Sequence, residues 1–195
     1  EFGEMRLSGQ GEMHLRVALE RLSGRYGVSV ESAATEVGYR ESIRGKASAR
    51  GRHRKQSGGH GQFGDVVLEV APLPRGEGVR FVDRITGGVV PRQYISSVEA
   101  GVRDFCQRGP LGFPLVDVEV TLTDGSYHTV DSSDMAFRQA ARIAMSEACP
   151  QAKPVLLEPI LAVEIVIPSD AMSRASALVS ARRGQIVGYD ARPGW

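Results

Sequence analysis

A basic run that ends in a glycine-rich turn, RGRHRKQSGGHGQFGD at residues 50–65, constrains the fold of this chain most strongly. No acidic residue occurs from Ser42 to Gly64, and most of the basic residues there occupy even positions, namely Arg44, Lys46, Arg50, Arg52 and Arg54, followed by Lys55. Small or apolar residues occupy odd positions. Because an extended strand sends alternate side chains to opposite faces, this spacing predicts a strand with one cationic edge and one mostly apolar edge.

The glycines at 58, 59, 61 and 64 allow positive φ or close backbone approach, as the tip of a hairpin requires. The run QFGDVVLEVAPL then returns with Val66, Leu68 and Val70 at alternate positions, which is typical of a half-buried strand. We therefore expect a long basic strand that begins with TEVGYRESI, then an adaptable loop, then a returning strand.

Three ligand-binding interpretations of the glycine loop compete with that of a merely solvated hairpin. Gly59, Gly61, Gly64 and Val66 fit the spacing G-x-G-x-x-G-x-V, but a dinucleotide fold needs a helix after the glycines, where a strand is predicted here. A protein kinase needs a strand lysine, an H-R-D loop and a D-F-G site, to which Asp104-Phe105-Cys106 is only a near match. The third is a polyanion-binding hairpin, and the unbalanced charge favours it over the solvated one, with RNA as the ligand.

Composition sets the outer bounds. A chain of 195 residues with 42% apolar residues buries a real core, as one domain or a few small ones, and its net charge of +1 makes the basic strand a local feature. Cys106 and Cys149 lie in separate helical patterns, which favours a reduced, cytoplasmic setting over a disulfide scaffold. The sequence shows no apolar run of membrane-spanning length and no signal peptide. Because it starts at Glu1 and not at a methionine, we expect a fragment of a larger protein.

Hydrophobic periodicity predicts the order of the elements. Helices are expected over 11–27, 94–109, 131–148 and 169–184, and Met135, Ala136, Ile143 and Ala144 are expected on the inner side of the third. Strands are expected over 5–9, 28–32, 80–85, 116–125 and 185–189, and within the apolar run 154–168, where Pro154 and Pro159 bracket a crossing between units. The first and last pieces each follow the order β-α-β, half of a ferredoxin-like fold.

The histidines give little support for a metal site or a catalytic site. Glu12-Met13-His14 lacks the H-E-x-x-H spacing of a zinc site, and neither the four histidines nor the two cysteines show metal-ligand spacing. His128, Asp131 and Ser132 contain the residue types of a hydrolase triad, but they lie close in sequence and no nucleophile-elbow motif accompanies them. A helix-capping Asp-Ser-Ser cluster explains the acid and the hydroxyls better, so we predict no catalytic and no metal site.

Three motifs carry a family resemblance: SGQGEMHL at 8–15, KQSGGHGQFGDV at 55–66 and DGSYHTVDSSDMAF at 124–137. Together with GGVVPRQYI, GPLGFP and PVLLEPI, they resemble the C-terminal part of bacterial elongation factor G, the GTPase that drives translocation on the ribosome. The resemblance implies the second half of domain III over residues 1–36, domain IV over 37–157 and the first half of domain V over 158–195. The implied fold is α+β, a central domain with a left-handed β-α-β crossover flanked by two partial ferredoxin-like units.

The resemblance also implies a site. In this family the tip of domain IV enters the decoding site of the small ribosomal subunit and follows the tRNA–mRNA duplex, with two tip loops that map onto Lys55–Gly61 and Ser126–Val130. Gln56, Ser57, Gly58 and Gly59 would contact backbone and 2′-hydroxyl groups, His128 with Tyr127 would form the second contact, and Arg52, Arg54 and Lys55 would hold ribosomal RNA phosphates. His60 completes this RNA-binding set, at a position where the family often has arginine.

GTP hydrolysis is not expected in this chain, because it has no G-x-x-x-x-G-K-[ST] phosphate loop. The resemblance places GTP and its magnesium in an N-terminal domain of a parent protein, and it implies no cofactor here, a monomer, and a cytoplasmic location. The stretches SDAMSRASALVS and RGQIVGYDARPGW depart from the housekeeping pattern and resemble a divergent elongation-factor-G-like paralogue. Such paralogues include factors that recycle or protect ribosomes, so the outcome of ribosome binding stays open at this point.

Overall fold

The computed structural model of the chain describes residues 5, 7–33, 38–56, 59 and 61–190. Two compact units are present, Glu1–Gly38 and Tyr39–Trp195. The first contains the helix α1, Glu12–Tyr26, which ends at Gly27 in the left-handed conformation (φ 66°), as the glycine there predicts. No described residue of this first unit is buried.

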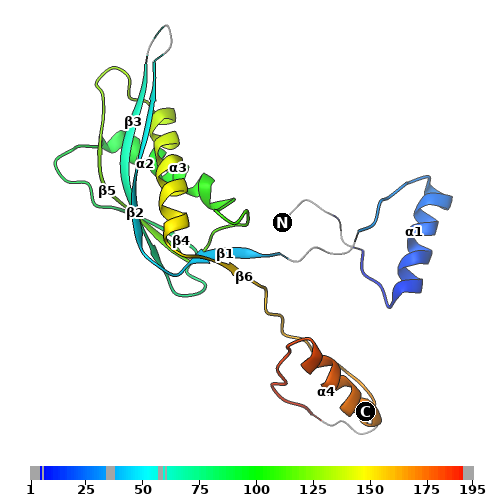
Figure 1. Ribbon diagram of the computed structural model, residues 1–195. Helices are drawn as coiled ribbons and strands as arrows, with labels where there is room; N and C mark the ends of the chain where they lie inside the picture. Colours follow the sequence, from blue (N-terminus) through cyan, green and yellow to red (C-terminus); the bar gives the residue numbers. More distant parts are fainter. Residues whose placement is uncertain (1–4, 6, 34–37, 57–58, 60, 191–195) are drawn as a thin grey trace. The chain divides into compact units, whose positions relative to one another are not determined.

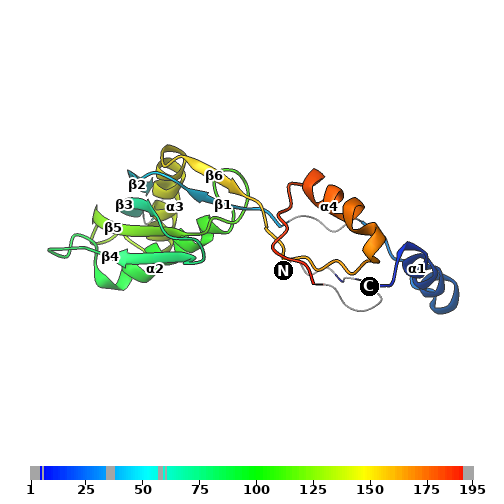
Figure 2. The same cartoon turned by 90° about the horizontal axis from the view of Figure 1, so that it is seen from below.

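A four-stranded sheet organises the second unit (Figure 1), with strands in the order β2-β3-β5-β4. These are β2, Ala47–Lys55; β3, Gln62–Pro72; β5, Val118–Ser126; and β4, Val79–Asp83. The pairs β2–β3 and β3–β5 are antiparallel, whereas β4 and β5 are parallel and are connected through the helix α2, Arg92–Cys106. This connection is the expected β-α-β crossover, and the helix α3, Asp134–Gln151, packs beside α2 on the same face of the sheet (Figure 2).

The predicted long basic strand is broken in two, which corrects the expectation of one continuous strand. Its first part is β1, Arg40–Ile43, which pairs antiparallel with β6, Pro154–Leu157, in a separate two-stranded sheet. The N–H groups of Arg44 and Gly45 both donate to the carbonyl of Ala152, at 3.2 and 2.8 Å, and these hydrogen bonds turn the chain from one sheet into the other. The expected strand at Pro154 is present as β6.

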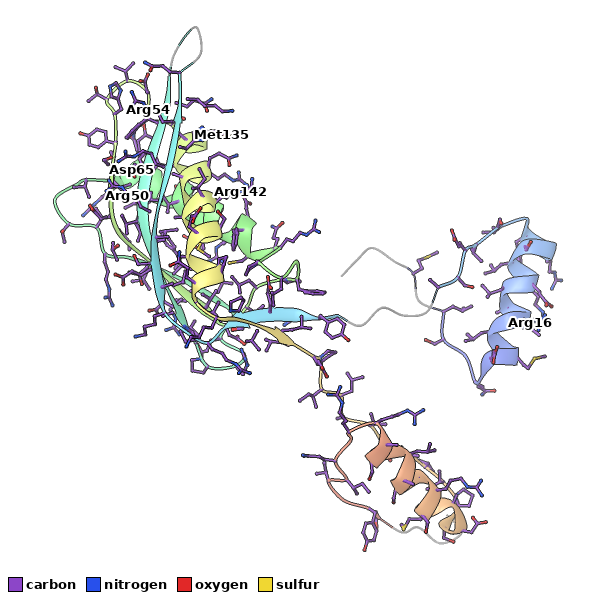
Figure 3. All side chains as sticks on the ribbon, in the orientation of Figure 1. Arg16, Arg50, Arg54, Asp65, Met135 and Arg142 are labelled. Atoms are coloured by element: carbon purple, nitrogen blue, oxygen red, sulfur yellow. The ribbon has the colours of Figure 1, made fainter. Side chains whose placement is uncertain are left out.

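The core lies between the sheet and the two helices. Val66, Leu68 and Val70 are at most 1% exposed, which confirms the predicted inner face of the returning strand. Helix α3 buries mainly small residues, Ala136, Ala140, Ala141, Ala144 and Ala148, together with Phe137. Met135 does not belong to this inner face, because its side chain is 60% exposed; Figure 3 shows it near the first turn of α3.

One acidic residue is buried where β1 meets the loop after α2. Glu41 is 0% exposed, and its Oε2 accepts a hydrogen bond from the N–H of Leu111 at 2.7 Å. Its Oε1 has no hydrogen-bond partner within the described residues. Burial raises the pKa of Glu41 above its usual value, against the smaller opposing effect of the Leu111 N–H.

The two pieces predicted as partial ferredoxin-like units, at the two ends of the chain, contain their predicted helices but lack predicted strands. After a short 3₁₀ turn, Ser169–Ala171, the helix α4 spans Met172–Ala181. Residues 28–32, 160–167 and 185–189 form no strand, which corrects the two β-α-β predictions. A strand needs a neighbouring backbone to complete its hydrogen-bond ladder, and none of the described strands pairs with these segments. The α+β class is confirmed, and none of the helices in the described residues has both the length and the apolarity needed to cross a membrane.

Candidate nucleic-acid interface

The predicted basic hairpin is present as β2 and β3, paired without interruption from Ala47–Val70 to Lys55–Gln62. Arg50, Arg52 and Arg54 are exposed, whereas Gly51 is buried against α3, so the predicted alternation is confirmed. Ser57, Gly58 and His60 lie outside the described residues. Gln56 and Gly59, the two described members of the predicted first loop between Lys55 and Gly61, are exposed.

A counter-charge for the basic strand comes from the adjacent strand. Asp65 pairs in register with Arg52 and is 0% exposed. Its carboxylate accepts hydrogen bonds from Arg50 (Nε to Oδ1, 2.8 Å; Nη2 to Oδ2, 2.5 Å) and from Arg52 (Nη2 to Oδ2, 3.2 Å), and Figure 3 shows Arg50 beside Asp65. The prediction of an unbalanced basic strand is thus wrong for these two arginines, because the stretch without acids ends at Gly64 and the returning strand places the next residue, Asp65, opposite Arg52.

The ionisation of Asp65 reflects this pairing. Burial would raise the pKa of Asp65, but hydrogen bonds from Arg50, from the Ser126 hydroxyl (Oγ to Oδ2, 2.5 Å) and from Arg52 outweigh burial and lower the pKa to about 2. Asp65 is therefore a carboxylate at neutral pH. It joins β2, β3 and β5 at a point close to the end of the hairpin.

Cations without an acidic partner are found farther along β2. Arg54 and Lys55 are exposed, and no ion pair involves either of them within the described residues. Arg54 faces the same side of the sheet as Arg50 and Arg52, beyond Asp65 toward the loop (Figure 3). Within β2, the basic residues that have no ion pair among the described residues thus lie at the loop end of the strand, while Arg44 and Lys46 lie exposed before its other end.

The second predicted loop follows β5 and is held by its own hydrogen bonds. The Nδ1 atom of His128 accepts from the N–H groups of Val130 and Asp131, at 3.3 and 3.1 Å. A ring nitrogen that accepts these bonds carries no proton, which leaves the proton of the neutral ring on Nε2; the same Nδ1 lies 3.5 Å from Oδ2 of Asp131. The side chains of Tyr127 and His128 are 48% and 53% exposed, and the N-cap of α3 is Ser133, whose hydroxyl accepts from the N–H of Ala136.

Geometry argues against the hydrolase alternative for this loop. The hydroxyl of Ser132 accepts a hydrogen bond from the backbone N–H of His128 at 2.9 Å. The imidazole of His128 is engaged with backbone N–H groups, not with that hydroxyl, so no nucleophile–base pair is formed. The Asp-Ser-Ser cluster instead organises the loop and caps the helix.

At one end of the second unit, the segment that follows β5 contacts β3 and Gly61, the described end of the first loop. The N–H of Phe63 donates to the carbonyl of Asp131 at 2.8 Å, and the N–H of Gly61 donates to its Oδ1 at 3.1 Å. The rings of Phe63 and His128 also lie 6.4 Å apart. The expected neighbourhood of the two loops is therefore present, and Arg54, Lys55, Tyr127 and His128 all flank this tip.

The sequence does not predict the role of Phe63 or the bridge that Asp131 forms to Gly61. The sequence pattern predicts Asp131 as a member of a helix-capping cluster or of a hydrolase triad, whereas its contacts reach 70 positions back along the chain to Gly61. A single sequence contains no signal for such a pairing. Only the register of β3 against the loop after β5 shows it.

These features define a class of domain: a mixed four-stranded sheet, covered on one face by two helices, whose hairpin and helix-capping loop form a common tip. Residues 35–153 match the family described as Elongation factor G, domain IV, and the chain belongs to this family. It is a family of translation elongation factors.

Similar proteins in other organisms support this family membership. An elongation factor G-like protein of Synechocystis is 56% identical over the whole chain, one of Thermotoga maritima is 48% identical over 97% of it, and elongation factor G of Aquifex pyrophilus is 46% identical over 97%. A crystal structure of a protein from Thermus thermophilus superposes with a TM-score of 0.86 over 95% of the chain, at 42% identity, and the match covers 28% of that protein. The chain spans only 27–29% of the length of the curated relatives.

Proposed function

We propose that the tip of the second unit contacts RNA in the decoding site of the small ribosomal subunit, and that it supports tRNA–mRNA translocation as part of a longer factor of the elongation factor G type. The observation that carries this proposal is the meeting of two loops beside the exposed cations Arg54 and Lys55. Any GTP hydrolysis belongs to other parts of such a factor, because this chain has no phosphate-loop motif.

The chemistry of the tip suits a polyanion with exposed bases. Arg54 and Lys55 supply charge for phosphates. His128 offers an Nε2–H donor, and the exposed Tyr127 beside it offers a ring for stacking, both of which serve recognition of splayed or paired RNA strands. Arg52 has a smaller role than the sequence suggested, since Asp65 already occupies part of its guanidinium.

A second outcome on the same surface is a factor that recycles or protects ribosomes. Two of the matched relatives, at 56% and 48% identity, carry the name elongation factor G-like protein and not elongation factor G. The same tip would then bind RNA, and the rest of the factor would decide between movement and subunit release. Replacing the matched stretch of Aquifex pyrophilus elongation factor G by this chain, and measuring translocation and subunit splitting, separates the two outcomes.

Binding of the chain to isolated small ribosomal subunits across a salt series tests the RNA contact. We expect Arg54→Ala with Lys55→Ala to weaken binding and to reduce the slope of log affinity against log salt by about 1 to 2, because about one counterion is released per phosphate contact. Arg108→Ala with Lys153→Ala is the matched control. It removes one arginine and one lysine, both exposed, beyond the C-terminal ends of α2 and α3. Equal slopes for both double variants would contradict the proposal.

A further inference from the structure

Asp131, directly after the second loop, binds the hairpin through both its side chain and its main chain. Its carbonyl accepts from the N–H of Phe63 at 2.8 Å, and its Oδ1 accepts from the N–H of Gly61 at 3.1 Å. Its own N–H donates to Nδ1 of His128 at 3.1 Å. One residue thus connects the end of the hairpin loop to the imidazole that the proposed function assigns to RNA.

Asp131 packs so closely on Gly61 that a side chain at position 61 would displace the Asp131 carboxylate. A Cβ added at Gly61 would lie 2.7 Å from the carboxyl carbon of Asp131. The Asp131 side chain is only 25% exposed. Its carboxylate is therefore placed against the hairpin backbone and is a poor candidate for a direct contact with a phosphate, which it would also repel.

We propose that Asp131 is a positioning residue: it holds the hairpin loop and the His128 loop at a fixed separation, so that the two bind RNA as one surface. This inference rests on the proposed function of the tip. Alignment of the two loops before binding lowers the ordering cost of association, and a loss of alignment weakens binding without removing any group that touches the ligand. Asp131→Ala and Gly61→Ala would disturb the same contact from its two sides.

Three substitutions separate this role from a charge effect. Asp131→Asn removes the charge but keeps Oδ1 as an acceptor, whereas Asp131→Ala removes both. We expect Asp131→Ala to lower affinity for small ribosomal subunits by about three- to tenfold, the usual effect of one lost hydrogen bond, and Asp131→Asn to bind within about twofold of the unchanged chain. Asp134→Ala is the control, since that carboxylate accepts a hydrogen bond from Ser97 on α2.

A double-mutant cycle tests whether Asp131 acts through Gly61. If it does, Gly61→Ala combined with Asp131→Ala weakens binding no more than either change alone. Additive losses, or equal losses in Asp131→Asn and Asp131→Ala, would overturn the proposal, because they would point to a contact or charge effect of Asp131 itself.

A measurement without ribosomes separates failure of this inference from failure of the proposed function. Amide hydrogen exchange of the 195-residue chain should be several-fold faster at Gly61 in Asp131→Ala, and unchanged in Asp131→Asn and Asp134→Ala. Unchanged exchange at Gly61 in Asp131→Ala would refute the positioning role whatever the chain binds. The opposite combination would refute the RNA contact and leave the positioning role intact. It consists of faster exchange at Gly61 in Asp131→Ala together with a ribosome affinity that does not change in Arg54→Ala with Lys55→Ala.

Discussion

At the scale of single residues, the behaviour of the basic strand depends on one buried acid. Asp65 forms ion pairs with Arg50 and Arg52, so the basic residues of β2, which look equivalent in the sequence, have different roles. Arg50 and Arg52 stabilise the junction of three strands, and Arg54 and Lys55 remain for a ligand. The same carboxylate gives the fold a defined dependence on pH.

Asp65→Asn should lower the free energy of unfolding by about 2 kcal/mol at pH 7, the value that corresponds to a fall in pKa from 3.8 to about 2. Because the folded pKa lies below the unfolded one, this stabilisation is full above about pH 4 and is lost as the pH falls toward about 2. Denaturant unfolding of both proteins from pH 2 to 7 measures the difference.

The comparison between the two proteins also removes the effect of Glu41, whose raised pKa destabilises the fold as the pH rises. Asp170→Asn, an exposed acid in the 3₁₀ turn before α4, is the control and should leave the free energy of unfolding unchanged. A penalty for Asp65→Asn that stays constant down to pH 2 would contradict the assigned ionisation.

At the scale of elements, the hairpin is held by helix α3 at points where strand residues have no side chain. A Cβ added at Gly64 would lie 2.5 Å from the carbonyl oxygen of Ala136, and one added at Gly51 would overlap the backbone of α3 at Ala140 and Ala144. The alanines of α3 permit this close approach. The direction of the tip is therefore set by backbone-to-backbone packing and not by large side chains.

Gly51→Ala or Gly64→Ala should destabilise the second unit by about 2–3 kcal/mol or more, because the helix and the sheet would have to move apart. The midpoint of denaturant unfolding provides the measurement. Gly24→Ala, in α1, has nothing within 4 Å of the added Cβ and should leave this transition unchanged. A loss below about 0.5 kcal/mol at both Gly51 and Gly64 would show that α3 does not seat on the hairpin as described.

At the scale of the whole molecule, stability is concentrated in residues 39–157. No residue of the described stretch 158–190 is buried, and Ile160, Leu161 and Val163 are 97%, 77% and 73% exposed. Such apolar segments form the hydrogen bonds of a strand and bury their side chains only when they pack against another part of a polypeptide. The domain boundaries predicted at 36 and 157 follow from the family resemblance. The difference in burial between residues 39–157 and 158–190 makes the boundary at 157 testable.

Removal of residues 158–195 should change the free energy of unfolding of the second unit by less than about 0.5 kcal/mol, since the described residues of this stretch add no buried side chain. A chain that ends at Gln151 is the matched control. It also lacks β6 and its pairing with β1, and it should lose several kcal/mol. Similar unfolding midpoints for the two truncated chains would place the boundary elsewhere.

Local patterns were enough to predict the basic hairpin, the inner face of β3 and the positions of the helices. Side-chain alternation and helical periodicity are short-range properties, and the spacing of Val66, Leu68 and Val70 reports burial directly. The strands at 28–32, 160–167 and 185–189 were predicted wrongly for the complementary reason: their composition favours strands, but a strand forms only against a partner.

By itself, the amino-acid sequence determined which segments of residues 39–157 are strands and helices, apart from the break between β1 and β2, where the charge lies along the chain, and which family the motifs resemble. Only the tertiary structure decided which of those charges are neutralised and how the two loops meet, through Asp65 and Asp131. The physical reason is distance along the chain: ion pairs and hydrogen bonds act over a few ångströms in space, and folding brings Asp131 to within that range of Gly61 across 70 positions of sequence.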